Sequence, residues 1–235
     1  MNYQLITNYD VLQTFIDLLP DANSNEKYLI HLMARKKYNT SGCIITKDYD
    51  FKKVITSKKH MISDIERLQI ELGKWTFNDE IIHQNHITVY IQPNPRCVRK
   101  AARELQRKIV DSLLDNGRLN IIRMYEEYLH KESSNKKYYV LDIDPIEKNT
   151  VIDIEELLSF FKSILTFIPL ILKSKNGYHV LVETDLIPLH LNKGGKWHND
   201  IRNNTAKTFQ VTPIGDGLCV LPGTVQSNFS PYIIT

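Results

Sequence analysis

Residues 138–144 read YYVLDID, an apolar run that ends in two carboxylates. A continuous run of aromatic, β-branched and aliphatic side chains of this length is typical of a buried strand. Side chains two positions apart in a strand point to the same face, so Asp142 and Asp144 are expected side by side. A divalent metal with hard oxygen ligands relieves their mutual repulsion best. Taken alone, a metal site and a plain strand-end turn are equally good interpretations.

The same spacing occurs once more, at Asp48 and Asp50. This pair lies in a polar, lysine-rich stretch, where a solvated loop is the better interpretation. Two aspartates at this spacing arise by chance about once in a chain of this composition. The pattern is therefore weak evidence without its neighbours.

Downstream of residue 144 the pattern switches between strand and helix. Residues 152–165 predict a helix and residues 169–174 a strand. Residues 176–183 predict a second strand, entered through an Asn-Gly turn, which is a hairpin signal. Short strands broken by Pro and Gly follow over 208–234. The C-terminal half is expected to be mixed α/β: strand, crossover helix, hairpin, then more strands.

Upstream, residues 86–92 alternate as a strand. Residues 96–114 carry apolar side chains at three- and four-residue steps, which predicts a long helix. Asn8 is placed to cap a first helix, and residues 61–73 predict another. Residues 26–37 fit a helix or a strand equally well.

Composition limits the class of protein. The 235 residues are 42% hydrophobic and 24% charged, as in ordinary globular proteins, which excludes a disordered, collagen-like or coiled-coil chain. Three scattered cysteines argue against a disulfide framework and fit a reducing compartment. The polar N-terminus and the lack of a long apolar run lead us to expect a cytoplasmic protein without membrane association.

The net charge of +3 is too small to indicate a nucleic-acid partner unless basic residues cluster. One cluster is present on the predicted helix 96–114, where four arginines recur at helical spacing: Arg96, Arg99, Arg103 and Arg107. Glu104 is the single acid within residues 96–108. Such a row suits a phosphate backbone, which is held without reading base sequence. A solvated helix face explains the row equally well.

Two further segments carry reactive side chains. The hexapeptide SKNGYH brings a hydroxyl (Ser174), an ammonium (Lys175) and an imidazole (His179) to one turn, which suits a polyphosphate. Taken alone, an ordinary polar hairpin is the better interpretation. Asp216 stands between two glycines, ahead of an apolar strand that ends in Pro-Gly-Thr, and a tight turn explains it on propensity.

In this order the segments resemble the archaeo-eukaryotic primase-polymerase superfamily, in the type found in phages, plasmids and CRISPR-associated systems. YYVLDID, SKNGYH and VLPGT carry the resemblance, with IQPNPRCVRKA as the strand-helix entry. The resemblance implies an α+β fold in two parts. An RRM-like mixed sheet forms the catalytic core over residues 86–235, and a small, mostly helical α/β unit over residues 1–85 packs beside it.

The resemblance also implies an activity. It is that of a DNA-directed primase or polymerase, a nucleotidyltransferase that joins NTPs or dNTPs on a single-stranded or primed DNA template and releases pyrophosphate. Two divalent ions, Mg²⁺ or Mn²⁺, are the implied cofactors. A helicase or another replication or CRISPR protein is an implied partner.

Each candidate residue receives a role from the resemblance. Asp142 and Asp144 hold the metals, and the arginine row holds the template. Three residues bind the incoming triphosphate: Ser174, Lys175 and His179. A third carboxylate normally completes such a metal site; Asp216 is the nearest match, and Asp200 or Asp185 are alternatives.

Two other functions fit the same residues. One is a catalytically silent nucleic-acid-binding protein of replication or of a mobile element, with the same fold. The other is a D-x-D glycosyltransferase, in which a metal holds a nucleotide-sugar diphosphate. The glycosyltransferase predicts no affinity for DNA and no role for the SKNGYH turn.

Overall fold

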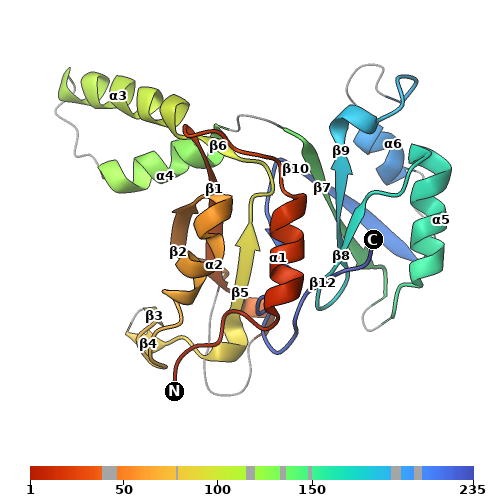
Figure 1. Cartoon of the computed structure of the whole chain (residues 1–235), viewed down its shortest axis with the longest axis horizontal. Coiled ribbons are helices and arrows are strands. Elements are labelled where there is room, and N and C mark those ends of the chain that lie inside the picture. The colour runs from red at the N-terminus through yellow and green to blue at the C-terminus, as the bar shows by residue number, and fades with distance from the viewer. Residues whose placement is uncertain are drawn as a thin grey trace.

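A computed structural model shows an α+β protein with six helices and three antiparallel sheets. Two of the sheets have five strands each, and Figure 1 shows them side by side, with helices packed against them. These counts refer to the described residues, which are 1–38, 47–77, 79–114, 120–132, 136–147, 150–191, 197–203 and 208–235. None of the helices within these ranges has the length and apolarity that a membrane span requires.

The first sheet has the strand order β11-β5-β1-β2, with β6 paired to β1. Its strands are β1 (Glu26–Ala34), β2 (Tyr49–Thr56), β5 (Ile87–Ile91), β6 (Arg96–Cys97) and β11 (Cys219–Val220). Residues 26–34 are therefore a strand. It is buried on both faces, since Tyr28 and Ile30 lie in one core while Leu29 packs in another. A strand without a polar face lacks the alternation that distinguishes it from a helix.

Two helices belong to this half of the chain. Helix α1 (Tyr9–Leu18) begins as predicted, because the Asn8 side chain accepts a hydrogen bond from the Val11 N–H. Helix α2 (Met61–Glu66) is shorter than the predicted 61–73. Its continuation lies against the N-terminus instead, where the Ile70 carbonyl accepts a hydrogen bond from the Tyr3 N–H. Those backbone groups are thus not available to extend the helix.

The second sheet has the strand order β10-β7-β9-β8-β12. Its strands are β7 (Tyr138–Pro145), β8 (Leu170–Lys173), β9 (Tyr178–Glu183), β10 (Phe209–Gly215) and β12 (Tyr232–Ile233). Helices α5 (Ile154–Leu165) and α6 (Trp197–Asn203) supply Phe161 and Ile201 to the core on one face. The expectation of a mixed sheet is wrong. Although α5 does connect β7 to β8, β9 inserts between these two strands and pairs antiparallel with both.

The two sheets share a core. Val140 on β7 and Leu181 on β9 join the core of the first sheet, whereas Leu141 and Val180 face α5 and α6. Strands β5 and β11 lie in the first sheet although their residues follow position 85. The boundary expected between residues 85 and 86 therefore runs through the first sheet.

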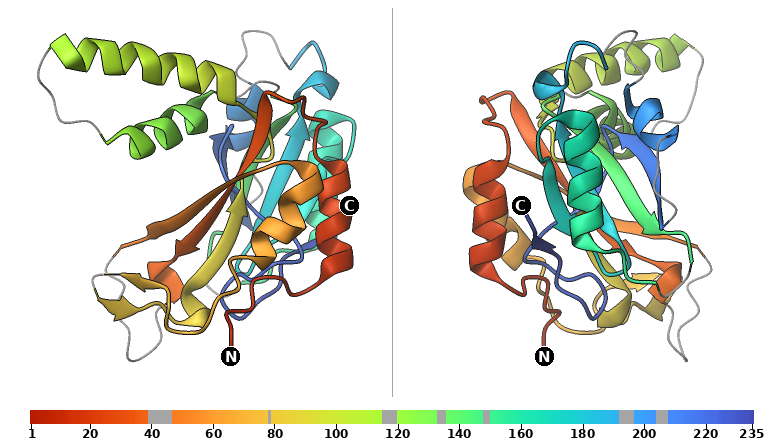
Figure 2. Two further views of the ribbon diagram at one scale, coloured as in Figure 1. Left: turned by 60° about the vertical axis from the view of Figure 1, so that its left-hand side comes forward. Right: turned by 90° about the vertical axis from the view of Figure 1, so that its right-hand side faces the viewer.

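Helices α3 (Val98–Leu114) and α4 (Ile121–Lys131) pack together and project from the body as an arm (Figure 2). Helix α3 begins at Val98 and not at the predicted Arg96, because Arg96 and Cys97 pair with β1. The remaining elements are short: β3 (Thr76–Phe77), β4 (Glu80–Ile81), η1 (Lys36–Tyr38), η2 (Lys58–His60), η3 (Gln84–His86) and η4 (Thr184–Leu186).

Candidate active site

The two acids of the YYVLDID run lie on the face of β7 that points away from α5 and α6. Leu141 and Ile143 pack in the core beneath those helices, so Asp142 and Asp144 point the other way. In the sheet register Asp142 lies opposite His179 on β9. The His179 Nε2 atom is 3.4 Å from the Asp142 Oδ1 atom. The acid pair and the imidazole thus belong to one cluster.

A pocket of about 380 Å³ opens over this cluster, between the two sheets. Both halves of the chain contribute charged or polar side chains to it, namely Arg35, Lys37, Asp142, Asp144, Ser174 and His179. Tyr90, His130 and Gln226 also line it. Acids, cations and an imidazole therefore meet in one cavity, although they come from segments far apart in the sequence.

The Ser174 turn depends on a glycine. The Ser174 hydroxyl accepts a hydrogen bond from the Gly177 N–H at 3.1 Å, which closes the turn between β8 and β9. A Cβ atom at Gly177 would lie 2.0 Å from the carbonyl oxygen of Ile143. Only glycine allows the turn to lie this close to β7 beside Asp144.

His179 is held in one neutral form. The Val220 N–H donates a hydrogen bond to its Nδ1 atom at 2.9 Å, so the ring hydrogen resides on Nε2, which faces Asp142. Burial, assisted by the positive charge of Lys37, lowers the pKa of His179 to about 4. The imidazole is therefore neutral at pH 7 and offers one hydrogen-bond donor to the pocket.

Burial also affects the two acids. It raises the pKa of Asp142 against the opposing effect of Lys37 and Arg35. Burial raises the pKa of Asp144 as well, with a further increase from the charge of Asp142. The ionised pair is thus costly without additional positive charge, which a bound cation would supply.

Arg35 and Lys37 line the pocket although no sequence pattern indicated them. Arg35 is oriented by Asp48, whose Oδ2 atom lies 2.9 Å from its Nε, and by a hydrogen bond of 2.7 Å to the Tyr90 hydroxyl. Lys37 lies close enough to both acids for their charges to raise its pKa, although burial lowers that pKa overall. No motif marks these two cations, which follow a strand without recognisable chemistry.

The second D-x-D pair fits the solvated-loop interpretation only in part, because Asp48 is exposed ahead of β2 whereas Asp50 lies on that strand. Asp48 holds Arg35, and Asp50 lies on β2 with its Oδ2 atom 2.6 Å from the His31 Nδ1. Both acids are engaged by residues of β1 or of the segment directly after it. Their spacing therefore reflects two separate structural contacts.

Lys175 lies beside the pocket rather than in it. Its ammonium donates hydrogen bonds to the Ser227 hydroxyl at 3.0 Å and to the Asn228 Oδ1 atom at 2.6 Å, and it lies over the Tyr38 ring. It lines an adjoining cavity of about 250 Å³, which shares Lys37 with the first.

Several residues that were expected to be functional do not line this pocket. Asp216 is not among the residues that line the pocket, since Arg96 and Asn94 engage its carboxylate oxygens. Arg96 is 1% exposed, so the expectation that it contacts a template fails. Neither Asp185, which is exposed in η4, nor Asp200 in α6 lines the pocket.

The other three arginines of the row are exposed on α3. They are Arg99, Arg103 and Arg107, and the last of these forms an ion pair with Glu104 at 2.9 Å. The arm thus presents a basic surface that begins at Arg99.

The donor set fits a hard divalent cation. Mg²⁺ is commonly bound by one or two carboxylates and completes its shell with substrate phosphates and water. Asp142 and Asp144 supply two such carboxylates on one strand. Within the described ranges no cluster of three or more His, Cys, Asp or Glu side chains is arranged to hold a metal ion. Two carboxylates suit an ion that completes its shell with substrate oxygens and water.

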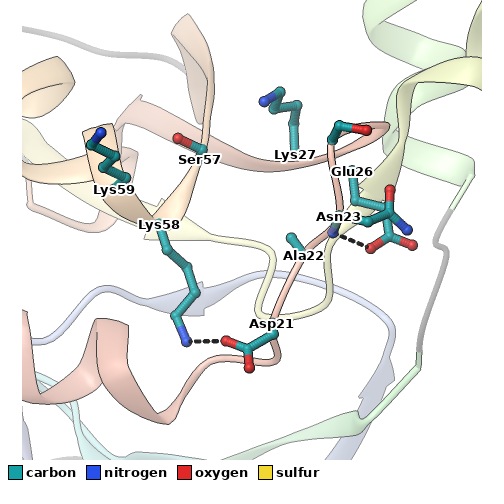
Figure 3. A pocket seen from close by; sticks show the side chains of 9 residues that line it. Asp21, Ala22, Asn23, Glu26, Lys27, Ser57, Lys58 and Lys59 are labelled. Carbon is teal, nitrogen blue, oxygen red and sulfur yellow. Dashed lines mark hydrogen bonds and ion pairs between the residues drawn. The ribbon is translucent and has the colours of Figure 1, made fainter.

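A second pocket, of about 390 Å³, lies between the loop after α1 and η2 (Figure 3). Lys58 lines this pocket, but its ammonium already donates hydrogen bonds to the Leu19 carbonyl at 2.8 Å and to the Asp21 carboxylate at 3.2 Å. Lys58 thereby holds the end of α1. This pocket contains none of the residues predicted to be functional.

No protein-family model, curated protein or solved structure matches this chain.

Proposed function

We propose that the chain is a template-dependent nucleotidyltransferase of the primase-polymerase type. The observation that carries the proposal is the convergence of Asp142, Asp144 and His179 with two cations from the first half of the chain in one pocket. The order of elements supports it. Strand, helix, two strands, helix and strand (β7 to β10) in the sheet order β10-β7-β9-β8 fit the RRM-like core that the resemblance implies.

Each side chain has a physical role in this proposal. Asp142 and Asp144 hold Mg²⁺ or Mn²⁺, which when bound lowers the pKa of the attacking hydroxyl and stabilises charge on the leaving pyrophosphate. The Nε2–H of His179 donates a hydrogen bond to a phosphate oxygen.

Arg35 and Lys37 face the same pocket and offset the charge of a triphosphate. Ser174 lines it beside His179. The arginines of α3 hold the DNA template.

The test is incorporation of labelled nucleotide on single-stranded DNA, with and without primer, in Mg²⁺ or Mn²⁺. Replacing Asp142 and Asp144 by alanine is expected to reduce extension by about 10³-fold or more, because the metal loses its protein ligands. DNA binding should remain close to that of the wild type. Asp185→Ala, an exposed carboxylate outside the pocket, is the matched control. Full extension by the double variant would contradict the mechanism.

One observation favours a second candidate, the catalytically silent nucleic-acid-binding protein. Asp216, the expected third carboxylate, is engaged by Arg96 and Asn94. Titration with Mn²⁺ in the presence of nucleotide separates the two candidates. An enzyme is expected to bind Mn²⁺ together with nucleotide at Asp142 and Asp144, whereas a silent protein is expected to bind DNA and neither of these.

A further inference from the structure

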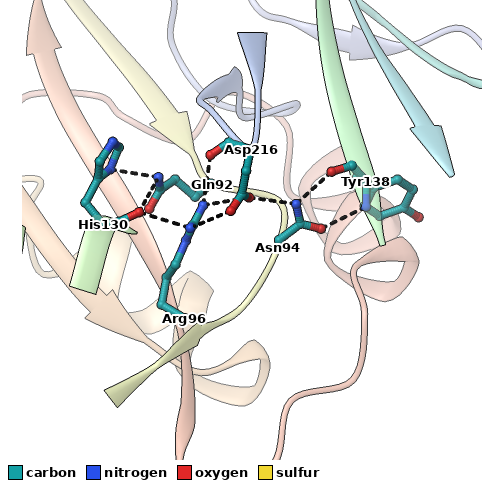
Figure 4. A network of polar contacts seen from close by, with 6 residues as sticks. All are labelled: Gln92, Asn94, Arg96, His130, Tyr138 and Asp216. Atoms are coloured by element: carbon teal, nitrogen blue, oxygen red, sulfur yellow. Dashed lines mark hydrogen bonds and ion pairs between the residues drawn. The ribbon is translucent and has the colours of Figure 1, made fainter. Parts of the chain in front are cut away.

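A polar network that is buried at Gln92, Asn94 and Arg96 connects the two halves of the molecule (Figure 4). Its members are Gln92, Asn94, Arg96, His130, Tyr138 and Asp216. They come from the segment that follows β5 and enters β6, from the end of α4, from the start of β7 and from the connection between β10 and β11. Four segments distant in sequence are thus held by one set of hydrogen bonds.

The Arg96–Asp216 ion pair is the centre of this network. The Arg96 guanidinium donates to both carboxylate oxygens of Asp216, each at 2.8 Å, and to the Asp216 carbonyl at 3.1 Å. It also donates to the carbonyl of His130 at 3.0 Å. A two-pronged contact of this kind fixes orientation as well as distance. Because Arg96 is buried, water cannot readily replace these hydrogen bonds to its guanidinium.

Asn94 extends the network to the strand that carries the acids. Its side chain donates to the Tyr138 carbonyl at 2.7 Å and accepts from the Tyr138 N–H at 2.8 Å. The same side chain donates to Asp216 at 2.8 Å. Tyr138 begins β7, four residues before Asp142, so the network fixes the entry of that strand.

Asp216 connects the network to His179. The chain runs from Asp216 through Gly217 and Leu218, which line the pocket, directly into β11. Within β11 the Val220 N–H donates to the His179 Nδ1 atom at 2.9 Å. Asp216 therefore anchors one end of the segment that carries the Val220 N–H, and the pairing of Cys219 and Val220 with β5 anchors the other end.

We propose that Arg96 and Asp216 form a positioning pair, which holds β11 against His179 and keeps its imidazole in the Nε2–H form. Asp216 acts through its contact with Arg96 and not as a metal ligand. The consequence for catalysis rests on the proposed function, but the effect on His179 does not.

The experiment is ¹⁵N NMR of histidine-labelled protein without substrate, combined with Mn²⁺ binding. The wild type is expected to show His179 with Nδ1 unprotonated and Nε2 protonated. Asp216→Asn should lose this signature and show a mixture of both tautomers, with Mn²⁺ affinity unchanged. An unaltered tautomer in Asp216→Asn, or a fall in Mn²⁺ affinity with the tautomer retained, would overturn the proposal.

Two further variants keep the test decisive. Arg96→Met combined with Asp216→Leu removes both charges, so no buried charge is left unpaired if Asp216→Asn fails to fold. This double variant should fold and still lose the single tautomer, and retention of the tautomer would overturn the proposal. Asp50→Asn, which removes a carboxylate bound to His31 in the same sheet, is the matched control and should keep the wild-type signature.

Because no substrate is needed, the outcome is independent of whether the chain polymerises nucleotides. Primer extension by the same variants then separates the two proposals. If the variants lose the single His179 tautomer but the wild type extends no primer, the positioning pair is supported and the proposed polymerase activity is contradicted.

Discussion

Burial keeps the His179 imidazole neutral in the folded protein, and this has a consequence for stability at low pH. Its pKa is about 4 in the folded state, against 6.5 for an exposed histidine. Below pH 6.5 the unfolded chain therefore binds a proton that the folded chain does not. Stability is fully retained above pH 6.5 and is lost as the pH falls to 4, by up to about 3 kcal/mol.

The variant His179→Gln should lack this loss. Urea unfolding from neutral to acidic pH is expected to give a flatter stability profile for the variant than for the wild type. Asp142 and Asp144 have raised pKa values that act in the opposite direction, but they are present in both proteins. His60→Gln, at an exposed position, is the control and should follow the wild type. Parallel profiles for His179→Gln and the wild type would contradict the prediction.

Local patterns predicted some site residues and could not predict others. Asp142 lies near the end of one apolar strand and His179 near the start of another. A polar side chain at such a position is costly to bury unless it has a partner, so both residues stand out in the sequence. Arg35 and Lys37 follow a strand without any motif, and only the packing of one sheet beside the other brings them to the acids. Asp216 occupies a turn as its flanking glycines suggest, but its partner Arg96 lies 120 residues away and no local signal pairs them.

At the scale of elements, the α3 arm offers the clearest test of template binding. Arg99→Ala with Arg103→Ala should reduce the dependence of log affinity on log salt by about 1 to 2, because each lost phosphate contact releases about one counterion fewer. Fluorescence anisotropy with labelled single-stranded DNA at several salt concentrations measures this slope. Arg67→Ala, directly after α2, where the side chain is 78% exposed, is the control. An unaltered slope would assign the row to an ordinary solvated face.

The type of most elements followed from sequence, whereas their ends and pairing did not. Helix α5 has a clear apolar period and an N-cap at Asp153, so its pattern suffices. Helix α2 stops early because its continuation pairs with the N-terminus, a contact between distant segments. The antiparallel sheet likewise depends on where β9 inserts, which no single strand encodes.

At the scale of the whole molecule, the shared core predicts one unfolding transition. The chain has two tryptophans; Trp75 packs against the first core and Trp197 lies in the second. Trp75→Phe and Trp197→Phe each leave one fluorescent reporter. Since Val140 and Leu181 connect the two sheets, both reporters should give the same urea midpoint and slope, after correction for the stability of each variant. Two separate transitions would show that the halves unfold independently.

The character of the sequence changes at residue 86, and for this reason a domain boundary is expected after residue 85. Composition changes cannot show that a later segment returns to an earlier sheet. Strand β11 does so after more than a hundred residues, when Cys219 and Val220 pair with β5.

The late return of β11 constrains the order of events during synthesis. A nascent chain that has emerged only as far as β5 leaves one edge of the first sheet uncovered, and neither His179 nor the Val220 N–H that orients it has been synthesised at that stage. Contacts between positions so distant along the chain have a high entropic cost and form slowly. The pocket around Asp142 and His179 is consequently completed among the last parts of the molecule, after translation has passed residue 220.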